Sequence, residues 1–236
     1  MSSKTFILTG GNEFEKGLEF ADQEAIALAD RASASPGLCL VVAITSSQRK
    51  ADELSQAGAF WFSSMGARHT EWLALSSLQA CNDPQNLEKL RKASLLYLVG
   101  GDPAFMLECI QDSELKAVFT NSLTRNGVFG GSGSGAAVLA QYVYLEDRDE
   151  LVAGLGFIPA GCLIPYHSSK GRKWAKRLAE LLPTSYIFGI DDKTAAIGYD
   201  NNWRVYGRGW VTIYKGGKPR KFSSGQPVAL NPKKRV

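Results

Sequence analysis

Short apolar runs alternate with longer amphipathic stretches along most of this chain, and this alternation restricts its fold more than any other feature. The apolar runs lie at residues 6–9, 38–44, 71–75 and 95–99, and the amphipathic stretches lie at 21–32, 49–57 and 84–92. Such alternation is typical of βαβ units, in which a mainly parallel sheet carries helices on both faces. Further helices are predicted over 104–110, where Pro103 suits the first turn, and over 113–125.

The last third of the chain changes character. A short strand is predicted at 162–164 and a basic amphipathic helix at 170–182. Four strand-like runs then follow at 186–190, 194–199, 204–206 and 211–214, separated by Gly, Asp and Asn turns, which predicts a β-meander. We therefore expect an α/β fold, a three-layer α/β/α sandwich with a mostly parallel central sheet and a C-terminal β-meander. Residues 1–230 would form one domain, followed by a basic tail at 231–236.

Composition narrows the class of protein further. The chain has 236 residues, of which 44% are hydrophobic, enough for one large globular domain. Its start shows no signal-peptide pattern and no apolar run approaches the ~18 residues of a membrane helix, so we expect a cytoplasmic protein that does not bind membranes. The net charge is +4, without a basic face interleaved with aromatic residues, so no nucleic-acid partner is expected.

The four cysteines are scattered and contain no C-x-x-C pair. This spacing favours buried free thiols over a metal site or a disulfide framework, and no metal or cofactor is expected. The four are Cys39, Cys81, Cys109 and Cys162.

A glycine-rich turn at 130–135 follows the apolar residues Val128 and Phe129, and a tightly packed helix is predicted after it, over 136–142. A nucleophile elbow needs small residues two positions before and two after the nucleophile, because the turn from strand to helix is very sharp. Three residues satisfy this pattern: Ser132, Gly133 and Ser134. The pattern alone therefore leaves the position of a nucleophile open.

Residues 130–137, GGSGSGAA, resemble the GGTSAGAA elbow of the cyanophycinase and peptidase E (aspartyl dipeptidase) family of serine peptidases. Four other segments resemble the family in the same order along the chain: YLVGGD at 97–102, GLGFIP at 154–159, His167 with KGR at 170–172, and GIDDKTA at 189–195. The resemblance implies a fold like that of class I glutamine amidotransferases. It also implies a serine-type hydrolase acting on small acidic peptides.

The resemblance assigns roles to particular residues. Aligned without gaps, the family's serine falls on Gly133, so Ser134 or Ser132 would have to attack the peptide carbonyl. His167 would be the base, oriented by an acid from the loop 146–150, for which Glu150 is the candidate. Lys170 or Arg172 would bind the substrate carboxylate, and the N–H groups of Gly101 and Ser134 would form the oxyanion hole. The expected substrate-binding residues are Gly100, Gly101, Asp102, Gly133, Lys170 and Arg172.

The sequence departs from the family at three points. Besides Gly133, Pro103 stands where many relatives carry glutamine, and no aspartate directly precedes His167. These departures indicate a degraded catalytic site on a retained scaffold.

Other interpretations stay open at this stage. The serines could simply cap the following helix, and Asp191 and Asp192 are interpreted as a turn or cap signal rather than as catalytic groups. Residues 131–136 also fit the G-x-G-x-x-A phosphate turn of dinucleotide sites, with Glu150 19 residues after Gly131. A third alternative is a non-catalytic relative that binds a peptide or partner, and the open partners include a second copy of the chain in a homodimer.

Overall fold

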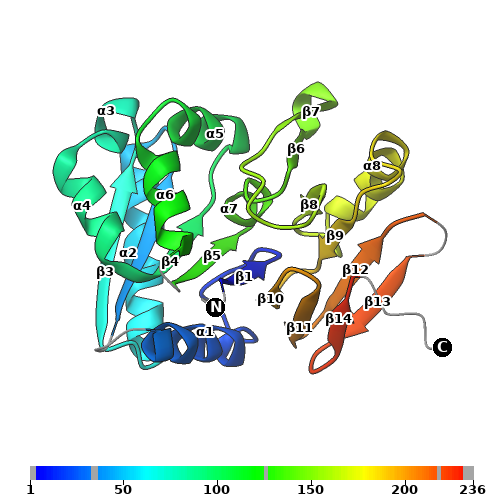
Figure 1. Cartoon of the computed structure of the whole chain (residues 1–236), viewed down its shortest axis with the longest axis horizontal. Helices are drawn as coiled ribbons and strands as arrows, with labels where there is room; N and C mark the ends of the chain where they lie inside the picture. Colours follow the sequence, from blue (N-terminus) through cyan, green and yellow to red (C-terminus); the bar gives the residue numbers. More distant parts are fainter. Residues whose placement is uncertain (1–3, 33–36, 125–126, 217–218, 231–236) are drawn as a thin grey trace.

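The structure is a computed structural model that describes residues 4–32, 37–124, 127–216 and 219–230. The basic tail expected at 231–236 lies outside the described residues. Figure 1 shows a body with helices and strands of the N-terminal half on one side and the later strands on the other.

The central sheet has eight strands in the order β14-β11-β10-β1-β5-β4-β2-β3. The five strands from β1 to β3 pair in parallel, and β10, β11 and β14 add an antiparallel edge next to β1. This confirms the predicted mostly parallel central sheet. The strands are β1 (Thr5–Thr9), β2 (Leu38–Ile44), β3 (His69–Leu75), β4 (Ala93–Val99), β5 (Val128–Ser132), β10 (Thr194–Tyr199), β11 (Asn202–Gly207) and β14 (Pro227–Ala229).

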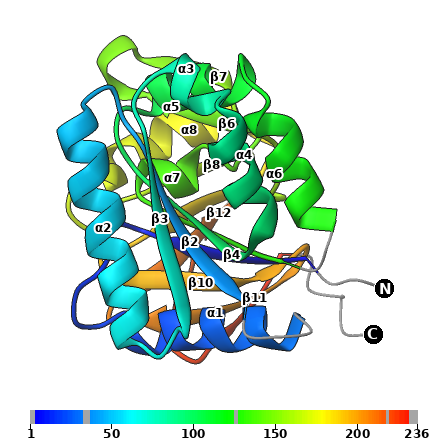
Figure 2. The same cartoon turned by 90° about the vertical axis from the view of Figure 1, so that its left-hand side faces the viewer.

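Helices cover both faces of this sheet, as Figure 2 shows. On one face, α1 (Glu19–Ala32) and α2 (Gln48–Ser64) pack on a core that includes Ile7, Val41 and Tyr97. On the other, α3 (Leu78–Cys81), α4 (Pro84–Lys92), α5 (Pro103–Gln111) and α6 (Leu115–Thr124) pack on a larger core. Strand side chains alternate between the two faces, which explains why the buried strands β2 and β4 read as continuous apolar runs.

The C-terminal strands are expected from the sequence to form one β-meander. In the structure they are divided between two sheets. A four-stranded sheet, in the order β13-β12-β9-β8, is formed by β8 (Cys162–Ile164), β9 (Ile187–Ile190), β12 (Trp210–Tyr214) and β13 (Arg220–Ser223). The chain crosses from β9 into β10 of the large sheet and returns to the small sheet at β12. Here β8 pairs in parallel with β9, so both strands end at the same edge.

The helix predicted over 136–142 is shorter in the structure. Strand β5 continues through Ser132, α7 spans only Ser134–Ala137, and the chain then enters a hairpin of β6 (Tyr142–Leu145) and β7 (Glu150–Ala153). The 3-10 turn η1 (Glu146–Arg148) joins these two strands. The basic helix predicted over 170–182 begins as the 3-10 turn η2 (Gly171–Trp174) and continues as α8 (Ala175–Leu181).

All four cysteines are buried and free, as predicted. In the part of the chain that the structure describes, no helix is long and apolar enough to cross a membrane.

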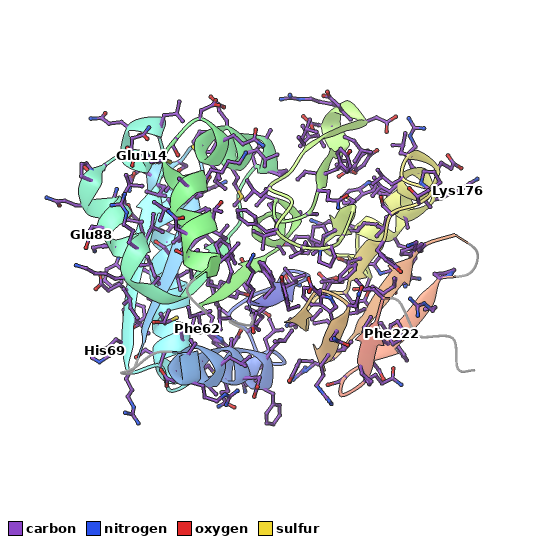
Figure 3. The ribbon with its side chains drawn as sticks, in the orientation of Figure 1. Phe62, His69, Glu88, Glu114, Lys176 and Phe222 are labelled. Carbon is purple, nitrogen blue, oxygen red and sulfur yellow. The ribbon has the colours of Figure 1, made fainter. Side chains whose placement is uncertain are left out.

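His69, an exposed residue that begins the edge strand β3, lies far from α7 and the C-terminal sheet (Figure 3).

A buried carboxylate joins α1 to α2. Asp22 is 2% exposed, and its Oδ2 accepts a hydrogen bond of 2.7 Å from the indole N–H of Trp61. Its Oδ1 has no hydrogen-bond partner among the described residues. Burial raises the pKa of Asp22 to about 7, because the charged form loses its water without gaining a cation.

We predict that Asp22 makes the protein less stable as the pH rises from about 4 to about 7. Over this range the unfolded carboxyl releases its proton while the folded one keeps it, so the free energy of unfolding falls. Asp22→Asn removes the charge, and we expect it to raise the free energy of unfolding by roughly 2 to 4 kcal/mol at pH 8. At pH 5, where the unfolded carboxyl is already mostly ionised, the gain should be less than about half of that at pH 8. Urea unfolding at both pH values measures this, and an equal effect of the substitution at pH 5 and pH 8 would contradict the prediction.

Candidate functional site

A sharp turn at Gly133 connects β5 to α7. Gly133 has φ 56° and ψ −121°, a backbone conformation that a residue with a side chain adopts only under strain. Its N–H donates to the carbonyl of Thr9 at 3.1 Å, and its own carbonyl accepts from the N–H groups of Ala136 and Ala137. The turn is thereby attached to β1 on one side and to α7 on the other.

The glycines two positions before and after Gly133 allow the backbone to pack closely. A Cβ atom on Gly131 would lie 2.4 Å from the carbonyl oxygen of Gly135, and one on Gly135 would lie 2.4 Å from that of Leu98. Both distances are far below van der Waals contact, so neither position accepts a side chain. This is the steric pattern of a nucleophile elbow with residue 133 at its apex. Ser132 and Ser134 are the flanking residues.

The ring of Tyr166 lies over the apex. A Cβ atom on Gly133 would be 3.2 Å from the Tyr166 hydroxyl oxygen, and one on Gly11 would be 2.2 Å from the ring. Tyr166 itself has φ 48°, and its N–H donates to the carbonyl of Gly10 at 2.6 Å. Burial, followed by the charges of Glu13 and Asp192, raises the pKa of Tyr166 to about 12. The hydroxyl above Gly133 therefore keeps its proton at neutral pH.

His167 is buried, with 1% of its surface exposed, and both ring nitrogens are hydrogen-bonded. Nδ1 lies 2.9 Å from Oδ1 of Asp191, and Nε2 lies 2.8 Å from the hydroxyl of Tyr214. Because a carboxylate only accepts hydrogen bonds, we assign the ring proton to Nδ1, so that Nε2 accepts from Tyr214. The other oxygen of Asp191 accepts from the N–H of Trp210 at 3.0 Å.

The carboxylate that contacts the imidazole is thus that of Asp191, rather than Glu150 as expected. Glu150 is exposed and begins β7, where it pairs with Leu145 across the hairpin. The sequence around Asp191 indicates only a turn, so its contact with His167 is not predictable from that pattern. The parallel pairing of β8 with β9 explains it, because the residues that follow these strands meet at one edge of the small sheet.

The two candidate serines have different surroundings. Ser132 is fully buried at the end of β5, and its hydroxyl donates to Glu13 at 2.7 Å. Ser134 is partly exposed at the start of α7, beside the loop that follows β4. There a Cβ atom on Gly100 would lie 3.1 Å from the N–H nitrogen of Ser134. Neither serine is among the hydrogen-bond partners that His167 has at its two ring nitrogens.

The remaining expected residues fall into two groups. Asp102 caps α5, with Oδ1 accepting from the N–H of Ala104 at 3.0 Å, and Gly101 packs against Thr45. Both lie in the loop beside Ser134. Lys170 and Arg172 are exposed, and Nζ of Lys170 lies 5.8 Å from the ring centroid of Tyr166. The structure therefore brings Gly100, Gly101 and Asp102 together with the turn. The ring of His167, the residue after Tyr166, is bonded to Asp191 and Tyr214, and Glu150 lies on the β6–β7 hairpin.

A cavity of about 320 Å³ lies beside the turn. Its wall is formed by the N-terminal part of α5, by α7, by the β6–β7 hairpin, by β8 with the residues that follow it, and by the region from Trp174 to Leu178. Ser134, Asp102 and Tyr166 all line it. Because Ser134 and Tyr166 both border the apex and line this cavity, a ligand bound at the turn would lie in it.

Comparisons with known proteins agree on one family. The sequence model of peptidase family S51 matches residues 6–204. A cyanophycinase from Geminocystis herdmanii (strain PCC 6308) is 24% identical over 206 residues, which cover 82% of this chain and 75% of that protein.

Two solved structures share the fold. A peptidase from an acI-B1 actinobacterium superposes with a TM-score of 0.83 at 22% identity, and the match covers 97% of both chains. A putative peptidase E protein from Listeria monocytogenes EGD-e superposes with a TM-score of 0.53 at 15% identity, over 94% of this chain and 98% of that one.

We predict that the hydrogen bond between Tyr214 and His167 stabilises the fold. Tyr214→Phe leaves Nε2 of a buried ring without its donor, so the free energy of unfolding should fall by about 1 to 3 kcal/mol. Tyr142→Phe is the matched control, since Tyr142 is 41% exposed and should change stability by less than about 0.5 kcal/mol. Urea unfolding measures both. Equal effects of the two substitutions would contradict the prediction.

Proposed function

The chain belongs to peptidase family S51, and we propose that it binds a small peptide in the cavity beside Gly133 without cleaving it by serine-type hydrolysis. The observation that carries this proposal is the apex of the elbow. Residue 133 has the strained backbone conformation of the turn, yet as glycine it offers no nucleophile. The hydroxyl of Tyr166 lies next to the space that a side chain at 133 would enter.

The neighbouring serines are poor substitutes for an apical nucleophile. Ser132 is fully buried and already donates to Glu13. Ser134 lies one residue beyond the apex, where the side chain leaves the turn in another direction. Because attack on a carbonyl tolerates errors of only about an ångström, this change of direction argues against efficient catalysis.

The position of His167 also supports a degraded catalytic site. A general base must lie within hydrogen-bond reach of the hydroxyl that it deprotonates. The imidazole of His167 is instead enclosed between Asp191 and Tyr214. To serve Ser134, it would have to break the bond at Nε2 and turn inside a packed environment.

Hydrolysis through Ser134 is the second candidate. It is favoured by one observation, that Ser134 lines the cavity beside the Gly100–Gly101 loop expected to supply an oxyanion hole. In this case an aspartyl-peptide substrate would need Lys170 or Arg172 to reach its carboxylate. Hydrolysis through Ser134 and specificity for aspartyl peptides are both predictions.

A dinucleotide site finds less support in the geometry. Phosphate turns of that kind lead into a long helix whose N-terminus contacts the pyrophosphate. Here α7 has four residues, and Glu150 lies on the hairpin rather than after a second βα unit.

We expect no covalent labelling of the wild-type protein by a fluorophosphonate probe. Turnover of an aspartyl dipeptide should be at least about 10³-fold below that of an active family member assayed in parallel, because loss of the nucleophile costs more than that in serine peptidases. Mass spectrometry of the labelled protein and chromatography of the dipeptide are the measurements.

The controls are Ser134→Ala and Ser132→Ala, each checked for folding by circular dichroism. Labelling or turnover of the wild type that disappears in Ser134→Ala would overturn the proposal and establish the second candidate.

A further inference from the structure

The cavity beside the turn has a largely apolar wall. Leu163, Ile164 and Leu178 contribute to it and are each at most 2% exposed in the folded chain. Aromatic rings add to the wall from two directions. Tyr144 and Trp174 form a tilted pair with centroids 5.9 Å apart, and Tyr166 lies toward Gly133. Binding of an apolar ligand against such a wall is favourable, because it removes apolar surface from water.

The charged groups of this wall are all acidic. Asp102, Glu146 and Asp147 line the cavity, and no lysine, arginine or histidine does so among the described residues. Glu146 is paired with Lys173, outside the lining. The carboxylate of Asp147 has a looser contact, 3.6 Å from Nε of Arg148. A ligand carboxylate would therefore meet charges of its own sign, and a ligand ammonium would meet opposite ones.

The volume limits the size of the ligand. About 320 Å³ is at the lower end of the range for small-molecule pockets, which begins near 300 Å³. One residue with an apolar side chain fits this volume, whereas the rest of a longer peptide would extend out of the cavity. Nζ of Lys173 already lies 5.5 Å from the centroid of the Trp174 ring, so of this pair Tyr144 is the ring that would attract a bound ammonium.

We infer that the cavity binds the apolar amino-terminal residue of a small peptide, with the side chain against the apolar wall and the ammonium toward the acidic groups. This inference rests on the proposed binding function and names the ligand class of that site. It differs from the acidic ligand that the family resemblance implies. Three observations on the described residues support it: the wall is largely apolar, no lysine, arginine or histidine lines it, and Asp147, one of the three lining carboxylates, has only a loose contact with Arg148.

Three small amides test the inference by isothermal titration calorimetry. L-leucinamide carries an apolar side chain and an ammonium, N-acetyl-L-leucinamide lacks the ammonium, and the α-amide of L-aspartate replaces the side chain by a carboxylate. We expect L-leucinamide to bind, and the other two to bind at least about tenfold more weakly. Equal or tighter binding of the aspartate amide, or no saturable binding of L-leucinamide up to about 10 mM, overturns the inference.

Two variants locate the binding in the cavity. Ala137→Leu fills part of the space, since Ala137 is buried and lines it, and should weaken the binding of both leucine amides about tenfold or more. Asp147→Asn should weaken only L-leucinamide, because its acetylated form carries no charge to lose. Glu180→Gln, an exposed acid of α8 outside the lining, is the matched control and should change nothing. If Ala137→Leu leaves the binding unchanged, the ligand lies elsewhere and the inference fails.

Failure of this inference is distinguishable from failure of the proposed function. The amides report binding, whereas probe labelling and dipeptide turnover report hydrolysis. A protein that binds L-leucinamide yet is labelled at Ser134 keeps the inference and loses the non-hydrolytic function. A protein that is not labelled and prefers the aspartate amide keeps the non-hydrolytic function and loses the inference.

Discussion

The close approach of the turn after β5 to the backbone of β4 determines the architecture of the whole site. Gly135 lies so near the carbonyl of Leu98, and Gly131 so near the carbonyl of Gly135, that neither could carry a Cβ atom. This contact holds the apex at residue 133, and the parallel pairing of β1, β5 and β4 brings the loops that follow them to one edge of the sheet. Ligands of open α/β sheets bind at such an edge. The cavity beside α7 lies there for the same reason.

Around this rigid turn, the polar side chains are arranged as a buried structural network. The ring nitrogens of His167 are satisfied by Asp191 and Tyr214, and the second oxygen of Asp191 by a backbone N–H. A fully satisfied network of this kind rigidifies the region that contains it. It stabilises the junction between β8, β9 and β12, whatever chemistry the edge supports. The network therefore stabilises this edge of the fold independently of which residue stands at position 133.

Much of the fold could be predicted from the residues alone, because local pattern and burial agree. The continuous apolar run of β2 (Leu38–Ile44) and the Asp-Pro start of α4 (Pro84–Lys92) are two cases in which element and bounds match the structure. The small residues after Gly135 favour a helix by propensity, but the chain leaves it after Ala137 to form the β6–β7 hairpin. The contact of Asp191 with His167 could not be foreseen, because it depends on the pairing of β8 with β9. The division of the last strands between two sheets was equally inaccessible, since periodicity does not report which strands pair.

The aromatic ring of Tyr166 lies against two glycines that come from distant parts of the chain, Gly11 and Gly133. A side chain at position 11 would overlap the ring, and one at position 133 would be crowded by its hydroxyl. Mutations at the three positions are therefore epistatic. A lineage with tyrosine at 166 tolerates only the smallest residue at 11 and resists a larger one at 133. A side chain at the apex is accommodated more easily once the ring at position 166 has been exchanged for a smaller residue, so the order in which such substitutions are made decides whether each is tolerated.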